Sequence, residues 1–189
     1  MSPRTPAQFD AIRSKRIQEI KDAALRLFAR DGYANTSISK IAREVGVSKG
    51  LLYNYFSSKE ELLAAILEEG FAFAGELLAE VQSISDPVER LRTMIEHTFA
   101  HVAEQVDYWR LYTSLAFQPA AGEVVGRMME SGGTPQLVLE FTVDAFRQMQ
   151  HPDPEREAWL LAAALDGIFM HYLQIGEEYP LEKMKRYLL

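Results

Sequence analysis

The segment GVSKGLLYNYF, residues 46–56, holds two glycines, one lysine and two tyrosines among eleven positions. These residue types differ from those of the acidic chain around them. Lysine carries a positive charge, glycine allows a close backbone approach, and tyrosine combines an aromatic ring with a hydroxyl group. The segment therefore predicts a local partner that differs from those of the rest of the protein.

Charge is distributed unevenly along the 189 residues. Residues 1–60 contain 11 Lys and Arg against 6 Asp and Glu, whereas residues 61–189 contain 9 against 21. A basic N-terminal third on a chain of net charge −7 indicates that this part meets a polyanion. Two solvated surfaces of opposite sign would give the same counts, so charge alone does not decide.

The composition excludes several classes of protein. There is no cysteine, which rules out disulfides and thiolate chemistry. The N-terminal stretch MSPRTPAQFDAIRSKR has no apolar centre and does not resemble a secretory signal, so we expect a cytoplasmic protein. In the apolar stretch 158–176, Asp166, His171 and Gln174 would make membrane insertion costly. We expect a helix buried in protein there, and no membrane partner.

Helix signals run along the whole chain, and strand signals are nearly absent. Residues 13–31 have helical apolar spacing and are followed by Gly32, a typical C-terminal cap. Further helices are predicted after the cap residues Ser58, Asp86, Thr134 and Asp153, the first of them running to about Gln82 and the second toward Gln105. Shorter helices are predicted over 107–117, 122–131 and 181–188. The pattern predicts an all-α protein.

Residues 38–56 have the register of a helix-turn-helix. Ala42 is small where two helices must cross, Gly46 suits a left-handed turn, and Ser48 can cap the second helix. The side chains expected to point inward are Ile41, Val45, Val47, Leu52 and Tyr55. The first turns of the second helix are then free of core duty, and these are the turns that meet base edges in the major groove.

From about Ile17 to Leu63 the chain resembles the DNA-binding domain of the TetR family of transcriptional regulators. The resemblance is carried by AALRLFARDGY, IAREVGVSKGLLYNYF and SSKEELL. It implies an all-helical homodimer with an N-terminal three-helix operator-binding domain, placed at residues 1–60. It also implies a helical domain, residues 61–189, for dimerisation and for sensing a small molecule. Beyond residue 65 the family diverges, so the resemblance does not identify the ligand.

The resemblance also assigns roles to single residues. Ser37 and Lys59 would hold phosphates at helix N-termini. Ser39, Lys49, Gly50, Leu51 and Asn54 would face bases, while Tyr53 and Tyr55 would reach the DNA backbone. Core packing explains Tyr55 equally well, and Arg43, Arg4, Arg13 and Lys15 are either sources of salt-dependent attraction or plain solvated charges. The predicted DNA-binding set is Ser37, Ser39, Arg43, Ser48, Lys49, Gly50, Leu51, Tyr53, Asn54, Tyr55 and Lys59.

Methionine, histidine and aromatic residues recur at helical spacing in the second part of the chain. Most must form core, but such a cluster also builds an adaptable apolar pocket. The predicted ligand-lining residues are Met94, His97, His101, Trp109, Tyr112, Phe117 and Phe141. His97, His101 and Glu104 fall on one helix face where a metal could bind, but such spacing arises often by chance. We therefore predict neither a metal nor another cofactor, and histidines that hydrogen-bond a carboxylate, a hydroxyl or a ligand.

Two helices, about 135–150 and 154–176, are the candidates for subunit contact. Ala163 and Gly167 are small enough to let a neighbouring backbone approach, and Met170 adds bulk. Two such helices from each subunit would form a four-helix bundle. An intrachain core helix is the alternative.

These observations predict a ligand-responsive transcriptional regulator that binds double-stranded operator DNA as a homodimer. We favour a repressor that a small apolar or amphipathic effector releases from a palindromic operator. An activator of the same fold is the first alternative, and an all-helical carrier or enzyme is the second. The enzyme is disfavoured because the sequence has no recognisable nucleophile with a base, phosphate loop or carboxylate pair.

Overall fold

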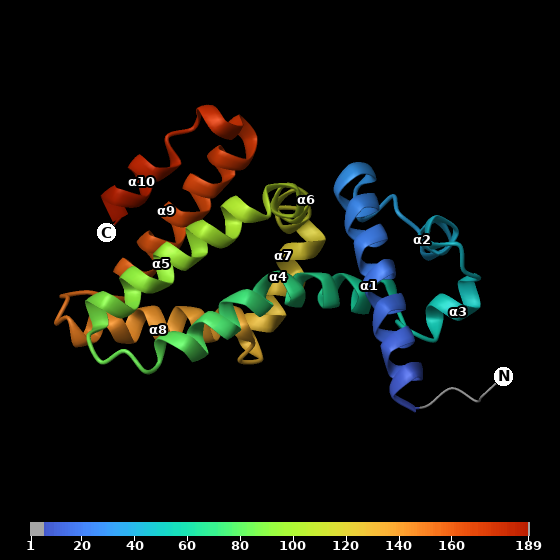
Figure 1. The fold of residues 1–189 in the computed structure, drawn as a ribbon, viewed down its shortest axis with the longest axis horizontal. Coiled ribbons are helices and arrows are strands. Elements are labelled where there is room, and N and C mark those ends of the chain that lie inside the picture. The colour runs from blue at the N-terminus through green and yellow to red at the C-terminus, as the bar shows by residue number, and fades with distance from the viewer. Residues whose placement is uncertain (1–5, 189) are drawn as a thin grey trace. The chain divides into compact units, whose positions relative to one another are not determined.

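The computed structural model describes residues 6–188, and this part of the chain contains helices and no β-strand (Figure 1). The predicted all-α class is confirmed. The helices are α1 Pro6–Asp31, α2 Ile38–Val45, α3 Lys49–Tyr53, α4 Lys59–Val81, α5 Pro87–Glu104, α6 Val106–Ala116, α7 Pro119–Glu130, α8 Thr134–Gln148, α9 Pro154–Ile175, the 3-10 turn η1 Gly176–Glu178, and α10 Leu181–Leu188.

Most helix starts follow the predicted caps. The Ser58 hydroxyl accepts the Glu61 N–H at 3.0 Å, Asp86 accepts from Val88 at 3.0 Å, and Asp153 accepts from Arg156 at 3.1 Å. These bonds satisfy backbone donors that the first helical turn leaves without a partner. α1 is longer than predicted, because it begins at Pro6 in place of residue 13. Proline is well suited to such a first helical turn.

The predicted cap at Thr134 was wrong. Gly133 occupies the N-cap position of α8, and Thr134 is already the first helical residue. The chain turns tightly through Gly132, which has φ +77°, and Gly133. A Cβ on Gly133 would lie 2.8 Å from the carbonyl oxygen of Met128. The lack of space for a Cβ therefore favours glycine at this N-cap position over a residue with a capping side chain.

The described residues form two compact units. The first comprises those up to Leu67 together with Ser114–Val124, and the second comprises Glu68–Thr113 together with those from Val125 onward. The segment 114–124 joins the N-terminal unit from far along the chain, which local sequence patterns do not indicate. As a result α4, α6 and α7 each contribute residues to both units.

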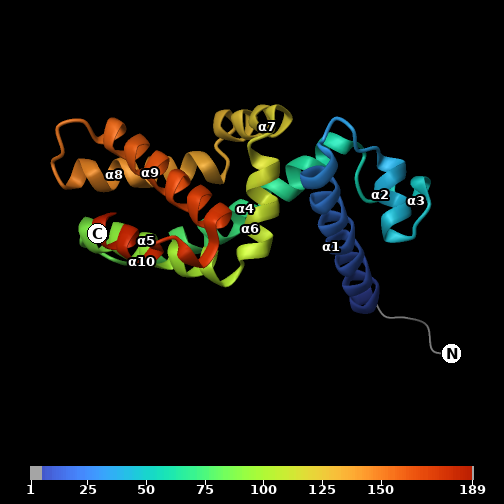
Figure 2. The same cartoon turned by 90° about the horizontal axis from the view of Figure 1, so that it is seen from above.

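The first unit packs around α1, α2 and α3, which lie side by side in Figure 2. Its apolar side chains come from every part of the unit, including α4 and the segment 114–124. Those that are fully or almost fully buried include Ile20, Ala24, Phe28, Ile41, Leu52, Leu63, Leu115 and Ala121. This core fixes the orientation of α2 relative to α1 and leaves the first turns of α3 outside.

The second unit contains two buried clusters. One is formed by Leu77, Val81, Leu91, Met94 and Ala145 from α4, α5 and α8. The other is formed by Ile95, Phe99, Ile168 and Leu181 from α5, α9 and α10. Figure 1 shows α5, α9 and α10 next to one another, and α8 packs on α9. The two clusters make α5 the central helix of this unit.

The apolar helix α9 is only partly covered by its own chain. Ala158, Ile168 and Leu173 are buried, but Trp159 is 57% exposed and Leu160 is 56% exposed. A single chain therefore buries only one side of this helix, and burial of the other side against protein stays a prediction. By length and composition the stretch Pro154–Glu178 could cross a membrane, and 17% of its most apolar window is buried. A helix that packs against protein meets the same criterion, so α9 has an apolar face available to some partner.

Gly70 on α4 allows an unusually close contact within the second unit. A Cβ at this position would lie 2.1 Å from Cε2 of Tyr112, a ring that is 6% exposed. Burial raises the pKa of this phenol, with a smaller effect of Tyr108. Because the ring is enclosed, it cannot move aside without disturbing its neighbours. The contact between α4 and α6 therefore depends on glycine at position 70.

We expect Gly70→Ala to lower the free energy of unfolding by about 1–2 kcal/mol, because overpacking outweighs the gain in helix propensity. Gly75→Ala in the same helix is the matched control. Its Cβ would make an ordinary contact of 3.8 Å with Thr134, so we expect a gain of about 0.5 kcal/mol. Urea unfolding of both variants measures the difference. Equal stability of the two would show that Tyr112 yields freely.

Candidate nucleic-acid interface

Two serines and a glycine define the geometry of α2 and α3. Ser37 caps α2 by accepting the N–H of Lys40 at 3.2 Å, and Ser48 caps α3 by accepting that of Leu51 at 3.1 Å. Between the helices Gly46 has φ 74°, in the left-handed region. The Val47 N–H returns to the Ala42 carbonyl at 2.9 Å. The predicted helix-turn-helix and its Ser48 cap are confirmed.

Nine of the predicted DNA-binding residues are exposed. Leu51 is 40% exposed and Tyr53 is 43% exposed, although both are large and apolar in part. Gly50 has no atom within 4 Å of an added Cβ, so the first turn of α3 is open to an approaching molecule. The exposed members of the set are Ser37, Ser39, Arg43, Ser48, Lys49, Gly50, Leu51, Tyr53 and Asn54.

Tyr55 and Lys59, the other two members, are half-buried. The guanidinium carbon of Arg13 lies 5.3 Å from the centre of the Tyr55 ring, a cation–π distance. This contact with α1 supports a packing role for Tyr55 over a phosphate contact. Lys15 is exposed, and Arg4 lies outside the described residues.

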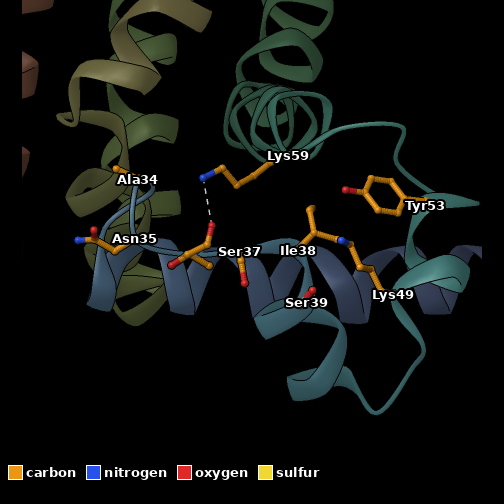
Figure 3. A pocket seen from close by; sticks show the side chains of 9 residues that line it. Ala34, Asn35, Ser37, Ile38, Ser39, Lys49, Tyr53 and Lys59 are labelled. Carbon is orange, nitrogen blue, oxygen red and sulfur yellow. Dashed lines mark hydrogen bonds between the residues drawn. The ribbon is translucent and has the colours of Figure 1, made fainter.

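A hollow of about 330 Å³ lies between the starts of α2 and α4 and the side of α3 (Figure 3). Lys49 and Lys59 bring two ammonium groups to it, and Tyr53 and Ser37 bring hydroxyl-bearing side chains. The Lys49 ammonium lies 5.8 Å from the centre of the Tyr53 ring. Cations, hydroxyls and helix N-termini are the groups that hold phosphate oxygens. The hollow is lined by Ala34, Asn35, Thr36, Ser37, Ile38, Ser39, Lys49, Tyr53 and Lys59.

Lys59 also has a role inside the protein. Its ammonium donates to the carbonyl oxygen of Tyr33 at 2.8 Å and to that of Thr36 at 3.1 Å. It lies 4.1 Å from the centre of the Tyr33 ring. Two of its three N–H donors are therefore directed at the connection between α1 and α2. A phosphate contact by Lys59 stays a prediction, and it would have to use the remaining donor.

Asp31 at the end of α1 fixes the other side of this connection. Hydrogen bonds from Arg30 and Lys40, each at 3.0 Å, hold the pKa of Asp31 at about 2. The Lys40 bond links α1 directly to α2. Because Lys40 is paired with Asp31, the positive charge of the exposed face comes from Lys49, Arg43 and Lys59.

The predicted ligand-lining residues fall in several places. His101, Trp109 and Tyr112 lie together with Phe73: the rings of Phe73 and His101 stack at 3.7 Å between centroids, and Trp109 is edge-on to His101 at 5.7 Å and to Tyr112 at 5.2 Å. Burial lowers the pKa of His101, so the neutral imidazole is favoured. The Trp109 indole N–H is buried and meets no acceptor among the described residues. We call Phe73, His101, Trp109 and Tyr112 the aromatic cluster.

The other four residues are not part of this cluster. Met94 and Phe141 belong to the core of α4, α5 and α8, and His97 faces Glu80 with 3.5 Å between Nδ1 and Oε2. Phe117 is 63% exposed and belongs to the first unit. The described residues contain no group of three or more side chains that could hold a metal ion.

The predicted dimer residues lie on the uncovered side of α9. Ala163 is exposed, Met170 is 41% exposed, and an added Cβ on Gly167 would meet no atom within 4 Å. Trp159 and Leu160 continue the same exposed face toward the start of the helix. We call these five residues the α9 face.

Sequence reasoning missed Gln118, whose side chain contacts the end of α1. Its Oε1 accepts the Tyr33 N–H at 2.8 Å, and its Nε2 donates to the Phe28 carbonyl at 3.0 Å. Gln118 stands directly before Pro119, and that local signal predicts only a helix start. Its partners are 85 and 90 residues away, beyond the reach of any local pattern.

Comparisons with known proteins agree with this geometry. A profile described as "Bacterial regulatory proteins, tetR family" matches residues 20–66. The HTH-type transcriptional regulator AcrR of Shigella flexneri is 28% identical over 182 residues, which cover 89% of this chain and 83% of that protein. Several other curated relatives are matched over only about a third to a half of their length.

Solved structures extend the similarity to nearly the whole chain. NalD of Pseudomonas aeruginosa, described as the secondary repressor of the MexAB-OprM multidrug efflux pump, is 25% identical with a TM-score of 0.74. That match covers 93% of this chain and 92% of NalD. A SmeT–triclosan complex is also 25% identical, with a TM-score of 0.73 and coverage of 90% and 86%.

We expect Lys59→Met to lower the free energy of unfolding by about 1–2 kcal/mol, because two carbonyl groups lose a charged donor. Lys49→Met is the matched control, and we expect less than about 0.5 kcal/mol, since its side chain is exposed. Denaturant unfolding without nucleic acid provides the measurement. If the two variants were equally stable, the bonds to Tyr33 and Thr36 would contribute nothing to folding.

Proposed function

Because this chain belongs to the TetR family of bacterial transcriptional regulators, we propose that it is a repressor that a small molecule releases from a near-palindromic operator. The single observation that carries the proposal is the exposed first turn of α3. Its N-cap is satisfied by Ser48, while Leu51 and Tyr53 remain in solvent next to Lys49. Exposed apolar side chains next to cations suit contact with base edges and phosphates.

Base recognition is assigned to α3 and phosphate contact to its surroundings. Lys49, Leu51 and Asn54 would contact base edges, with Gly50 allowing close approach of the helix. Ser37, Arg43 and Tyr53 would hold phosphates around the hollow. The site of action is then chromosomal DNA in the cytoplasm. The description of NalD as a repressor supports repression in preference to activation.

We expect selection from a random duplex library to return a near-palindrome with half-sites about one helical turn, ~34 Å, or somewhat more apart. Leu51→Ala should then relax the preference at single positions, because a contact to a base is lost. Arg43→Ala should weaken binding to all sequences alike and lower the salt slope by about one.

Arg127→Ala on α7 is the control for the loss of an exposed arginine, and we expect unchanged affinity. Fluorescence anisotropy at several salt concentrations compares these variants on selected and scrambled duplexes. The proposal is contradicted if the unaltered protein does not distinguish the two duplexes at any salt concentration.

The α9 face supports the proposed homodimer. Trp159, Leu160 and Met170 expose large apolar areas, and Ala163 and Gly167 between them leave room for a second helix. α8 packs beside α9, so two copies would form a four-helix bundle around a twofold axis. Such an arrangement would bury the apolar surface that the chain leaves open.

Gly167→Arg should convert the dimer into a monomer, because the arginine has space within one chain and none at a closely packed seam. Light scattering would then report about 21.5 kDa in place of twice that mass. Gly126→Arg on α7 is the matched control, since an added Cβ there also meets nothing within 4 Å. A Gly167→Arg protein that keeps the dimer mass would move the seam to another surface.

The aromatic cluster is the proposed effector site. A buried indole N–H without an acceptor supplies a polar anchor among apolar rings, a combination typical of small-molecule sites. The SmeT–triclosan complex shows a protein of this fold with such a ligand. Tyr112 in the cluster contacts α4 at Gly70, and α4 begins at Lys59 beside the α1–α2 connection. An effector that displaces Tyr112 would shift α4. It would favour the DNA-free form to the extent that it binds that form more tightly than the DNA-bound form.

A further inference from the structure

The connection between α1 and α2, residues 32–37, decides where the helix-turn-helix lies on α1. It contains a left-handed residue, Gly32 with φ +84°. The buried Thr36 hydroxyl donates to the Gly32 carbonyl at 3.0 Å, and the Thr36 N–H donates to the Tyr33 carbonyl at 3.2 Å. Such a turn has few internal hydrogen bonds, so its conformation depends on groups that approach from elsewhere in the chain.

Two long side chains hold the peptide groups of Tyr33 from different parts of the sequence. Lys59 donates to the Tyr33 carbonyl at 2.8 Å, and the Oε1 atom of Gln118 accepts the Tyr33 N–H at 2.8 Å. Lys59 lies at the start of α4, within residues 1–60, the predicted DNA-binding domain. Gln118 comes from the junction of α6 and α7 and reaches the same residue across 85 positions of sequence.

The Gln118 carboxamide is fully used in this position. Its Nε2 donates to the carbonyl of Phe28 at 3.0 Å and to that of Ser114 at 3.2 Å, while Oε1 accepts from Tyr33. Phe28 lies in the last turns of α1, and its carbonyl also accepts the Gly32 N–H at 3.0 Å. One side chain therefore adds a bond to the end of α1, fixes the start of the connection and is itself bonded to the last turn of α6.

We propose that Gln118 is a positioning residue for DNA binding. Its Oε1 accepts the Tyr33 N–H and keeps the α1–α2 connection in the shape that presents α3 to DNA. This inference rests on the proposed function.

The test compares Gln118→Met, which removes both the acceptor and the donors at similar length, with Gln118→Glu, which keeps the acceptor for Tyr33. Binding to the selected duplex is measured well below both melting temperatures. Backbone amide exchange of Tyr33 is followed by NMR. Gln82→Met, an exposed glutamine just after α4, is the control for the substitution itself.

We expect Gln118→Met to bind about three- to tenfold more weakly on every duplex, the change that loss of one or two hydrogen bonds would produce. The Tyr33 amide should exchange faster in this variant only. Gln118→Glu should bind more tightly than Gln118→Met, because it keeps the Tyr33 bond although it loses the two bonds that Nε2 donates. Gln82→Met should stay within about twofold of the unaltered protein. If Gln118→Met fails to fold, Gln118→Asn, which is one methylene too short to reach Tyr33, carries the same expectation.

Three outcomes would overturn the inference. Unchanged affinity of Gln118→Met despite faster exchange at Tyr33 would show that the bond does not position α3. Equal weakening in Gln118→Glu with Tyr33 still protected would assign the effect to the bonds that Nε2 donates to Phe28 and Ser114. Absence of DNA binding by the unaltered protein would overturn the proposed function together with this inference, whereas the first two outcomes leave the proposed function intact.

Discussion

A short turn between two helices leaves backbone N–H and C=O groups without partners inside the turn. The rest of this structure depends on the side chains that bond these groups at Tyr33. The Tyr33 carbonyl accepts a hydrogen bond from Lys59, and the Tyr33 N–H donates one to Gln118. Both side chains come from distant segments of the chain. The lysine ammonium also lies over the ring of the same residue. Since the turn sets the position of α2 on α1, it also sets the position of α3. The surface that we propose to face DNA is therefore positioned by contacts that do not themselves touch DNA.

The same residues explain why the helical scaffold is shared between two compact units. α4 supplies Lys59 at its start and Gly70 further on, and α6 supplies Tyr112 and then leads to Gln118. Each helix thus carries a contact of the second unit and a contact of the first along one continuous backbone.

Two exposed apolar surfaces differ in chemistry and hence in the partner each suits. On α3, Leu51 and Tyr53 are accompanied by Lys49 and exposed polar residues, a mixture that suits a charged and grooved polyanion. On the α9 face, Trp159, Leu160 and Met170 flank small residues, and the exposed Arg156 one turn earlier is paired with Glu157. That surface suits a helix of similar composition. The difference separates the proposed DNA contact from the proposed seam between subunits.

The sequence by itself determined the helices, their caps and the register of the helix-turn-helix, because these depend on residues within about four positions of one another. Ser48 before α3, Gly46 in the turn and Pro87 after Asp86 are signals of this kind, and each was found where it was expected. The misplaced cap at Thr134 shows the limit, since the Met128 carbonyl that selects Gly133 approaches through space. Tertiary structure alone decided that Lys59 holds the Tyr33 and Thr36 carbonyls, that Phe117 lies apart from the aromatic cluster, and that Gln118 reaches α1. Hydrogen bonds and ring contacts across 20 to 90 positions leave no periodic trace in a single chain, because their partners are brought together only when the core closes.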